Sequence, residues 1–529
     1  MIFRFFTSII IASFLIIPAG KALAVAPDFI VGPAKNETFL KAGETKNFSI
    51  ILVNRFAEDT NFSINYSPVI SDKDGNLVPS KDKILGEVKV PKNVFVKSLQ
   101  SKTIEVSITA DKNEEPGSRA IGIFISPEKD GQSEIRARSQ IGVLAIIRVE
   151  GQAIESGSFV DLEIFDDKKV RLGGDVDLKI SFANTGNVHL NPYGVLVVKN
   201  IFGKEVFAQK IDPWYVMPKS ERFRILNTNT NNFFGRYTAT VSLNRGYGDL
   251  IETKTISFYT FPFWFPIILV FVLLAVIFWL GKKGIFTGVA VCTLLLVGVV
   301  NVHAQMSSGN YKVQFDSVNF GGGLSSSTSY VQESTFGEVT TGEGSSANYN
   351  LHAGYQQMNE VYISISSASD VTPSPDLGSI SGGTADGSTQ VNVATDSVSG
   401  YALYINASTT PALQSAGDSF ADYTPAGVNP DFSFATPSSN SFFGFSPEST
   451  DTTSRFLDNG TTCATGALDT ADSCWDGFDV STKIISENSG SNTPLGTDTT
   501  IKIRAETGAS RNQTAGSYVA DIILTAFSK

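Results

Sequence analysis

Two of the three cysteines in this 529-residue sequence, Cys463 and Cys474, lie close together in the second half of the chain. Because the targeting segments described below place this half outside the cytoplasm, the pair predicts one disulfide bond. Closing a loop of this length stabilises a fold by about 3 kcal/mol on the loop-entropy model. A redox pair is the alternative, which the lack of Cys-x-x-Cys spacing disfavours. The third cysteine, Cys292, lies in an apolar run and is expected to act as a small apolar residue.

Four carboxylates surround the cysteine loop and are candidate ligands for Ca²⁺, which prefers oxygen: Asp469, Asp472, Asp476 and Asp479. Their spacing matches no EF-hand loop. A solvated acidic loop is therefore the favoured interpretation, and no other metal or cofactor is expected.

Catalytic motifs are scarce. The three histidines are scattered, and no His-Glu-x-x-His, Gly-x-Ser-x-Gly or phosphate-loop pattern occurs. A pair of carboxylates for glycoside hydrolysis stays open, because only the fold can bring such a pair together. Several aromatic residues could stack on sugars, although the core of a β-sandwich is the favoured place for most of them: Tyr401, Tyr404, Phe443, Phe445 and Trp475. The sequence therefore predicts no enzyme and no evident small-molecule substrate.

Charge divides the chain into two unlike halves. Residues 305–529 hold 7 Lys and Arg against 23 Asp and Glu, a net of −16, whereas residues 25–260 hold 30 against 29, a net of +1. The whole chain carries −11, which argues against nucleic acid as a partner.

The first 26 residues have the pattern of a signal peptide, with a basic start, a short apolar core and small residues that predict cleavage after Ala24. A permanent N-terminal anchor is the alternative. Residues 261–280 are almost entirely apolar and reach about 30 Å as a helix, which predicts a transmembrane span.

A second apolar run follows directly. Lys282 and Lys283 lie in a short loop, 281–284, that the positive-inside rule places in the cytoplasm. Residues 285–304 are either a second transmembrane helix or an internal signal that is cut after Ala304. Both interpretations place the two large segments outside the cell membrane. A fusion of two once-separate secreted proteins also explains the pattern.

The remaining segments are rich in short period-two stretches bounded by turn residues, such as residues 103–108 and 401–405. The predicted fold class is mainly β: tandem Ig-like antiparallel β-sandwiches, a central hydrophobic helical hairpin and a C-terminal all-β domain. The predicted domains are sandwiches at 27–150 and 151–260, a Gly/Ser-rich hairpin region at 305–358 and an acidic all-β domain at 359–529.

Four segments carry a resemblance to the WxL-interacting cell-surface proteins of Gram-positive bacteria: residues 116–123, 140–144, 183–190 and 234–237. The resemblance implies a peptidoglycan-binding sandwich, a second Ig-like domain and a transmembrane anchor. The strands at 399–405 and 515–522 are similar to those of WxL-type wall domains, but the final strand lacks the Trp-x-Leu signature.

The function expected from the sequence is a membrane-anchored surface protein that binds cell-wall polymer or another surface protein without catalysis. The alternative is a subunit or chaperone-like component of a surface filament or surface layer, whose sandwich donates or accepts a strand.

Overall fold

The computed structural model describes residues 28–71, 77–80, 85–128, 133–165, 168–172, 176–228, 234–262, 307–308, 311–312, 321–326, 331–336, 342–345, 350–353, 360–377 and 382–529. The predicted cleavage sites at Ala24 and Ala304 and the predicted loop lysines, Lys282 and Lys283, lie outside these residues.

Every regular element of the described residues is a β-strand, so the predicted mainly-β class with sandwich domains fits the structure. The predicted central helical hairpin is wrong as far as the described residues extend. Phe261, the expected first residue of a transmembrane helix, instead ends a strand and pairs with Leu172. Within the described part of the chain, no helix is long and apolar enough to cross a membrane. The transmembrane-helix and cell-membrane assignments built on that hairpin are corrected accordingly.

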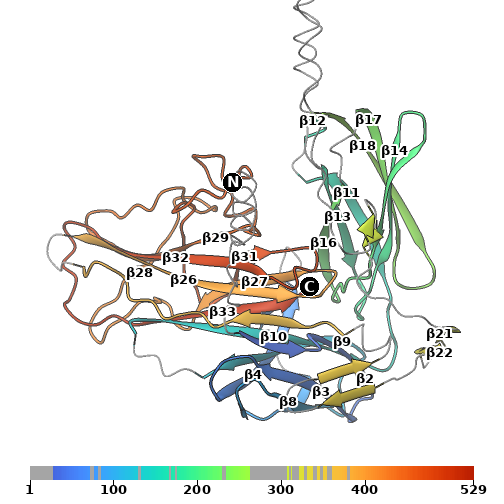
Figure 1. Ribbon diagram of the computed structural model, residues 1–529, viewed down its shortest axis with the longest axis horizontal. Helices are drawn as coiled ribbons and strands as arrows, with labels where there is room; N and C mark the ends of the chain where they lie inside the picture. The colour runs from blue at the N-terminus through green and yellow to red at the C-terminus, as the bar shows by residue number, and fades with distance from the viewer. Residues whose placement is uncertain are drawn as a thin grey trace, which may run out of the picture.

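A ten-stranded sheet joins residues from both ends of the chain (Figure 1). Its strands from the first half of the chain, in spatial order, are β6 (Gly86–Lys89), β8 (Ser101–Ala110), β3 (Thr45–Asn54) and β1 (Asp28–Gly32). Its strands from the second half continue with β25 (Ile363–Ser366), β26 (Gly383–Thr395), β32 (Thr497–Thr507), β29 (Ser441–Ser449) and β28 (Ala421–Asp422), and β30 (Asp476–Gly477) also pairs with β29.

A nine-stranded sheet also joins strands from both halves of the chain. From the second half of the chain it contains β31 (Lys483–Glu487), β27 (Tyr401–Ala407) and β33 (Ala520–Ser528). From the first half it contains β10 (Ile135–Val149), β9 (Gly117–Pro127), β4 (Thr60–Ser71) and β5 (Leu77–Pro79), and β2 (Lys35–Leu40) and β7 (Asn93–Val96) pair with β10 and β4 respectively.

The two sheets enclose one hydrophobic core that draws on both halves of the chain. It includes Phe29, Ile50 and Ile123 from the first half and Leu403 and Ile503 from the second, all of which are fully buried. Alternation explains this core, since β32 buries every second residue along Ile501, Ile503 and Ala505. Residues 28–149 are called the N-terminal sandwich below, and residues 360–529 the C-terminal half.

A second Ig-like domain, residues 157–261, has its own core, which includes Leu178, Phe182 and Val241. Its three-stranded sheet contains β11 (Gly157–Ile164), β13 (Val176–Asn184) and β16 (Ser220–Thr228). Its five-stranded sheet contains β12 (Val170–Leu172), β18 (Ile251–Phe261), β17 (Gly235–Asn244), β14 (Tyr193–Asn200) and β15 (Glu205–Ile211).

Three small hairpins lie between this domain and the C-terminal half in the sequence. They pair β19 (Ser307–Ser308) with β20 (Tyr311–Lys312), β21 (Gly321–Ser326) with β22 (Val331–Phe336), and β23 (Gly342–Ser345) with β24 (Asn350–Ala353).

Candidate functional site

The main candidate site is the strand seam, defined as the pairing of β10 with β33 and of β1 with β25. β33 runs parallel to the first half of β10, from Ile135 opposite Ala520 to Gly142 opposite Phe527. β2 then takes over the same edge of β10 from Leu144 onward, and β9 occupies the other edge. Figure 1 shows β10 between the C-terminal half and the rest of the N-terminal sandwich. One strand of the first half thus extends the sheet of the second.

The inward side chains of β10 complete the core of the C-terminal half. Ile135, Ala137 and Ile141 are at most 1% exposed and belong to the same buried cluster as Leu524 and Ile503. Burying an isoleucine side chain contributes about 1.5–3 kcal/mol relative to leaving it in water. Removing β10 would therefore expose both an unpaired edge of β33 and an opened apolar core.

Polar contacts on the outer face of the seam fix its register. Arg136 Nη2 donates to Asp521 Oδ2 at 2.9 Å, and Arg136 Nε lies 2.9 Å from Asp521 Oδ1. Thr525 Oγ1 donates to Gln140 Oε1 at 3.0 Å. Both pairs join residues 385 positions apart. Because a one-residue slip would separate both pairs, they specify this alignment over its neighbours.

Ser139 carries the one polar side chain of the inward row. Its hydroxyl donates to the carbonyl of Ser366 at the end of β25 and accepts the main-chain N–H of Ala368 at 2.8 Å. Ser139 is only 2% exposed, so these bonds satisfy a buried hydroxyl that would otherwise destabilise the core. The contact links β10 in one sheet to β25 in the other.

The second pairing of the seam is antiparallel. Asp28 to Val31 of β1 lie opposite Ser366 to Ile363 of β25. Burial raises the pKa of Asp28. The guanidinium of Arg55, 3.0 Å away, partly offsets this rise by favouring the ionised carboxylate. A Cβ atom on Gly32 would overlap the ring of Tyr362, so glycine is needed where these two segments of the chain approach each other.

The outer face of the seam is covered by an apolar cluster to which three parts of the chain contribute. Phe527 packs edge-on against Phe124 with 5.7 Å between ring centroids, and a Cβ atom on Gly142 would overlap the Phe527 ring. Met217 and Tyr215 from the second Ig-like domain cover the same cluster. This cover explains why the second half of β10 is buried on both faces, unlike a strand with one solvated side.

The structure disperses the four predicted calcium ligands. Asp469 accepts the N–H of Ser449, Asp479 accepts that of Ser481, and Asp472 lies 3.5 Å from Lys502 Nζ. Within the described part of the chain, no group of three or more metal-binding side chains is found.

Asp476 is engaged by two cations. It is paired with Arg455 at 2.7 Å and with Lys483 at 2.9 Å. Burial opposes its ionisation, but the charges of Lys483 and Arg455 hold its pKa below the ordinary value. These two ion pairs give Asp476 a structural role.

Cys463 and Cys474 lie at bonding distance, with 2.01 Å between sulfur atoms, and both are 1% exposed. The neighbouring Trp475 is also 1% exposed, and Tyr401 and Phe443 are fully buried. These aromatic rings therefore fill the core instead of offering a stacking surface for sugars.

One arrangement that sequence reasoning missed has the composition of a catalytic triad. Ser118 Oγ lies 2.8 Å from His189 Nδ1, and His189 Nε2 lies 2.8 Å from Glu37 Oε1. However, Ser118 is 3% exposed and its hydroxyl also accepts the main-chain N–H of His189. A nucleophile needs access to a substrate, so we interpret the group as a buried polar link between β2, β9 and the second Ig-like domain.

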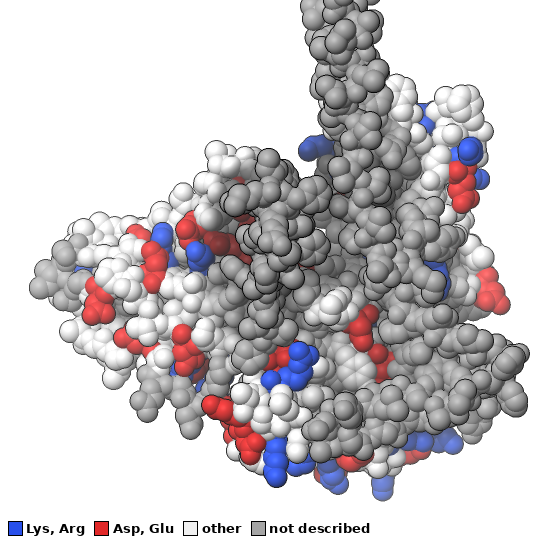
Figure 2. All heavy atoms as spheres, viewed as in Figure 1, with Lys and Arg blue, Asp and Glu red and all other residues white. Residues whose placement is uncertain are grey.

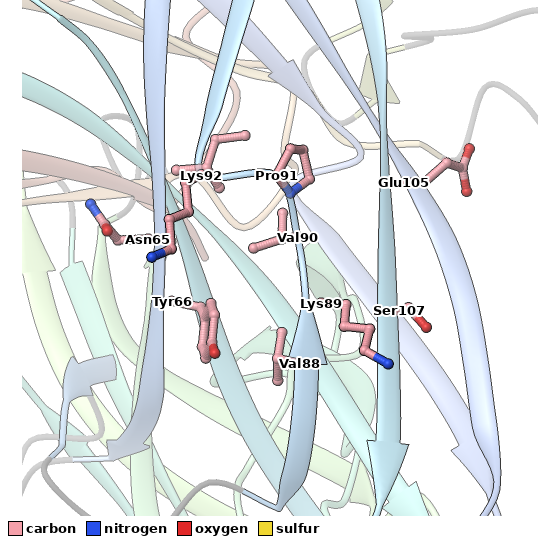
Figure 3. Close-up of a pocket in the computed structure, with 10 residues that line it drawn as sticks. Asn65, Tyr66, Val88, Lys89, Val90, Pro91, Lys92, Glu105 and Ser107 are labelled. Carbon is pink, nitrogen blue, oxygen red and sulfur yellow. The ribbon is translucent and has the colours of Figure 1, made fainter.

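A cavity of about 570 Å³ lies at the far side of the N-terminal sandwich from the seam, between β4, β6 and β8 (Figure 3). Figure 3 shows Tyr66 beside Val88, and Lys89 and Lys92 also line the cavity.

On the visible face of the molecule, basic and acidic side chains are interspersed (Figure 2). The described side chains on this face therefore form no broad patch of one sign for a charged polymer.

No family model and no curated protein matches the chain. Similar solved structures include the class 5 fimbriae chaperone CfaA, with 17% identity over 43% of this chain and 98% of that one, at a TM-score of 0.25. The YadV chaperone has 10% identity over 43% of this chain and 100% of that one, also at 0.25. The CsuC–CsuE chaperone–tip adhesion subunit pre-assembly complex from Csu pili of Acinetobacter baumannii has 10% identity, covers 44% and 99%, and has a TM-score of 0.24.

These comparisons give no support to the expected WxL-interacting family. Because the identities and TM-scores are so low, the likenesses establish no shared function. The functional argument therefore depends on the geometry of the seam.

Proposed function

We propose that the chain is a non-catalytic component of surface assembly, in which the first half serves the second as a chaperone-like strand donor. The observation that carries the proposal is β10, whose edge pairs with β33 and whose side chains fill the core of the C-terminal half. Addition of a strand from one protein to the sheet of another is an established mode of recognition. Here donor and acceptor belong to one chain.

The C-terminal half has the properties of a subunit that needs this strand. β33 pairs with β27 on one edge and with β10 on the other, so it would be an open edge without the donor. Open apolar edges pair with other chains and cause aggregation. A donor strand would keep the half folded and prevent such pairing until assembly.

This proposal is favoured over binding to cell-wall polymer, the first expectation from the sequence. The wall-binding expectation depended on a family resemblance that no family model supports. The seam, in contrast, is a specific set of contacts between two halves that differ in composition. It supplies a partner for each half. Partners of the assembled protein would then be other surface proteins.

The test separates the halves without removing either. A site for a specific protease is inserted between residues 262 and 307 of the full chain, and the cleaved protein is analysed by size-exclusion chromatography. Both fragments should elute together and separate only in denaturant, because the seam buries a continuous core. In the variant Ile141→Asp, an unpaired charge enters that core and the fragments should separate or aggregate after cleavage.

The matched control is Ile251→Asp, which places the same charge at a strand residue that is 67% exposed. This variant should behave like the parent. Immediate separation of the parent fragments as two folded monomers would contradict the proposal, because the C-terminal half would then need no donor.

A further inference from the structure

A second cavity, of about 340 Å³, lies between the second Ig-like domain and the C-terminal half. One wall comes from Trp214 and from β16, which within the described part of the chain pairs with β13 alone. The opposite wall comes from residues 452–454 and 487–489 and from Ser399. The cavity therefore lies where two parts of the molecule meet, apart from the strand seam.

Two arginines of β16 line this cavity, and the nearest opposing charges, Glu487 for Arg222 and Asp212 for Arg224, act on them without a direct ion pair. Arg222 Nη1 donates to the carbonyl of Tyr215 at 2.8 Å, and Arg224 Nη1 donates to that of Asp212 at 2.9 Å. Among the described residues, neither guanidinium forms an ion pair. The acidic residues of the cavity are already engaged, since Glu487 pairs with Lys529 and Asp177 accepts a hydrogen bond from Asn227.

A third cation, Lys35, lies near the two arginines. Burial, reinforced by the charges of Arg222 and Arg224, lowers the pKa of Lys35 to about 7. Burial also lowers the pKa of Arg222 and of Arg224. Proteins rarely bury several like charges without a counter-charge, because each loses its hydration.

Trp214 supplies an independent sign of a missing acceptor. Its side chain lines the cavity and is 4% exposed, yet its indole Nε1–H has no hydrogen-bond partner among the residues that the structure describes. The guanidinium of Arg224 lies over its ring, 5.9 Å from the centroid. A buried donor without an acceptor is uncommon in folded proteins, and this one shares its cavity with two arginines that form no direct ion pair among the described residues.

We propose that this cavity binds an oxyanion of the phosphate class, held by Arg222, Arg224 and the indole N–H of Trp214. Arginine suits such a ligand because its planar fork donates two parallel hydrogen bonds to phosphate oxygens. The hydroxyls of Ser399 and Ser454 on the opposite wall supply further donors, which a tetrahedral anion can use. A bound anion would join the second Ig-like domain to the C-terminal half, an interaction beyond the strand donation proposed above and independent of it.

The test uses the full chain and inorganic phosphate. Phosphate is titrated by isothermal calorimetry, and thermal unfolding is followed in parallel, with sodium chloride and sodium acetate at the same ionic strength. Phosphate should bind saturably and raise the melting temperature, because a ligand that binds only the folded state stabilises it. Chloride should have little effect, and acetate should bind at least tenfold more weakly.

Three variants locate the site. Arg224→Gln should weaken phosphate binding at least tenfold, and Trp214→Phe should weaken it several-fold while keeping the aromatic packing. Ser454→Trp, at an exposed residue of the rim, should block the cavity without disturbing a core, so it serves if the other variants fold poorly. Arg236→Gln, which removes an exposed arginine of β17, is the matched control and should bind like the parent.

An equal response to chloride would show only charge screening and would overturn the proposal. Equal binding of acetate would overturn the phosphate assignment. Phosphate binding that Arg224→Gln and Ser454→Trp leave unchanged would place the anion elsewhere and overturn the proposed site.

Discussion

At the scale of single residues, the pairing of β10 with β33 has a glycine where a larger residue would clash. Gly142 of β10 lies against the ring of Phe527, and a Cβ atom there would overlap it. Both residues are buried, so neither can move into solvent. A glycine in the middle of a strand usually weakens it, and here the close approach of an aromatic ring explains its presence.

Gly142→Ala should therefore lower the free energy of unfolding by about 1–3 kcal/mol, the usual cost of overfilling a packed core. Urea denaturation measures the change. Gly417→Ala is the control, because a Cβ atom there would meet open space. In a Phe527→Ala background the ring is gone, and Gly142→Ala should then have little effect. Additive losses in the double variant would show that the two residues do not interact.

At the scale of elements, period-two alternation at residues 103–108 predicted a strand correctly, because β8 buries one face and exposes most of the other. It said less about β10, because the second half of that strand is buried on both faces. The apolar run that predicted a helix from residue 261 assigned a strand residue to a helix. Phe261 is apolar because it belongs to a paired strand of the second Ig-like domain, and composition alone cannot distinguish these uses.

The pairing of Cys463 with Cys474 was easier to predict than the pairing of strands, because the second half of the chain holds no other cysteine. The loop is also organised by Asp458, which is fully buried and accepts the N–H of Gly460 and the hydroxyl of Thr470. A loop with few apolar contacts needs such internal bonds to keep one conformation.

Replacing both cysteines with serine should lower the free energy of unfolding by about 3 kcal/mol, because the unfolded chain regains the entropy that the crosslink removes. Chemical denaturation measures the loss, and Thr461→Ala, at an exposed residue two positions before Cys463, is the control. Thiol labelling of the native, non-reduced protein should modify neither sulfur. Ready labelling of both would mean that the disulfide does not form.

At the scale of the whole molecule, the shared core was beyond prediction from the sequence. The pairing of β10 with β33 joins residues separated by 385 positions, and parallel pairing leaves no turn signal between the strands. Arg136 and Asp521 look like ordinary surface charges until the register is known. Composition did divide the chain into two halves, but it gave no sign that one half completes the other.

The shared core implies that the N-terminal sandwich and the C-terminal half unfold as one cooperative unit, whereas the second Ig-like domain has a separate core. Ile141→Ala and Leu524→Ala lie on opposite sides of the seam, and each should cost about 2–5 kcal/mol as a buried truncation. Both should lower the midpoint temperature of the same unfolding transition in differential scanning calorimetry, although they lie in different halves of the chain. Leu178→Ala, equally buried in the second domain, should lower the midpoint temperature of a different transition. If Ile141→Ala and Leu524→Ala lowered separate transitions, the two halves would be independent folding units, and β10 would contact the C-terminal half without completing it.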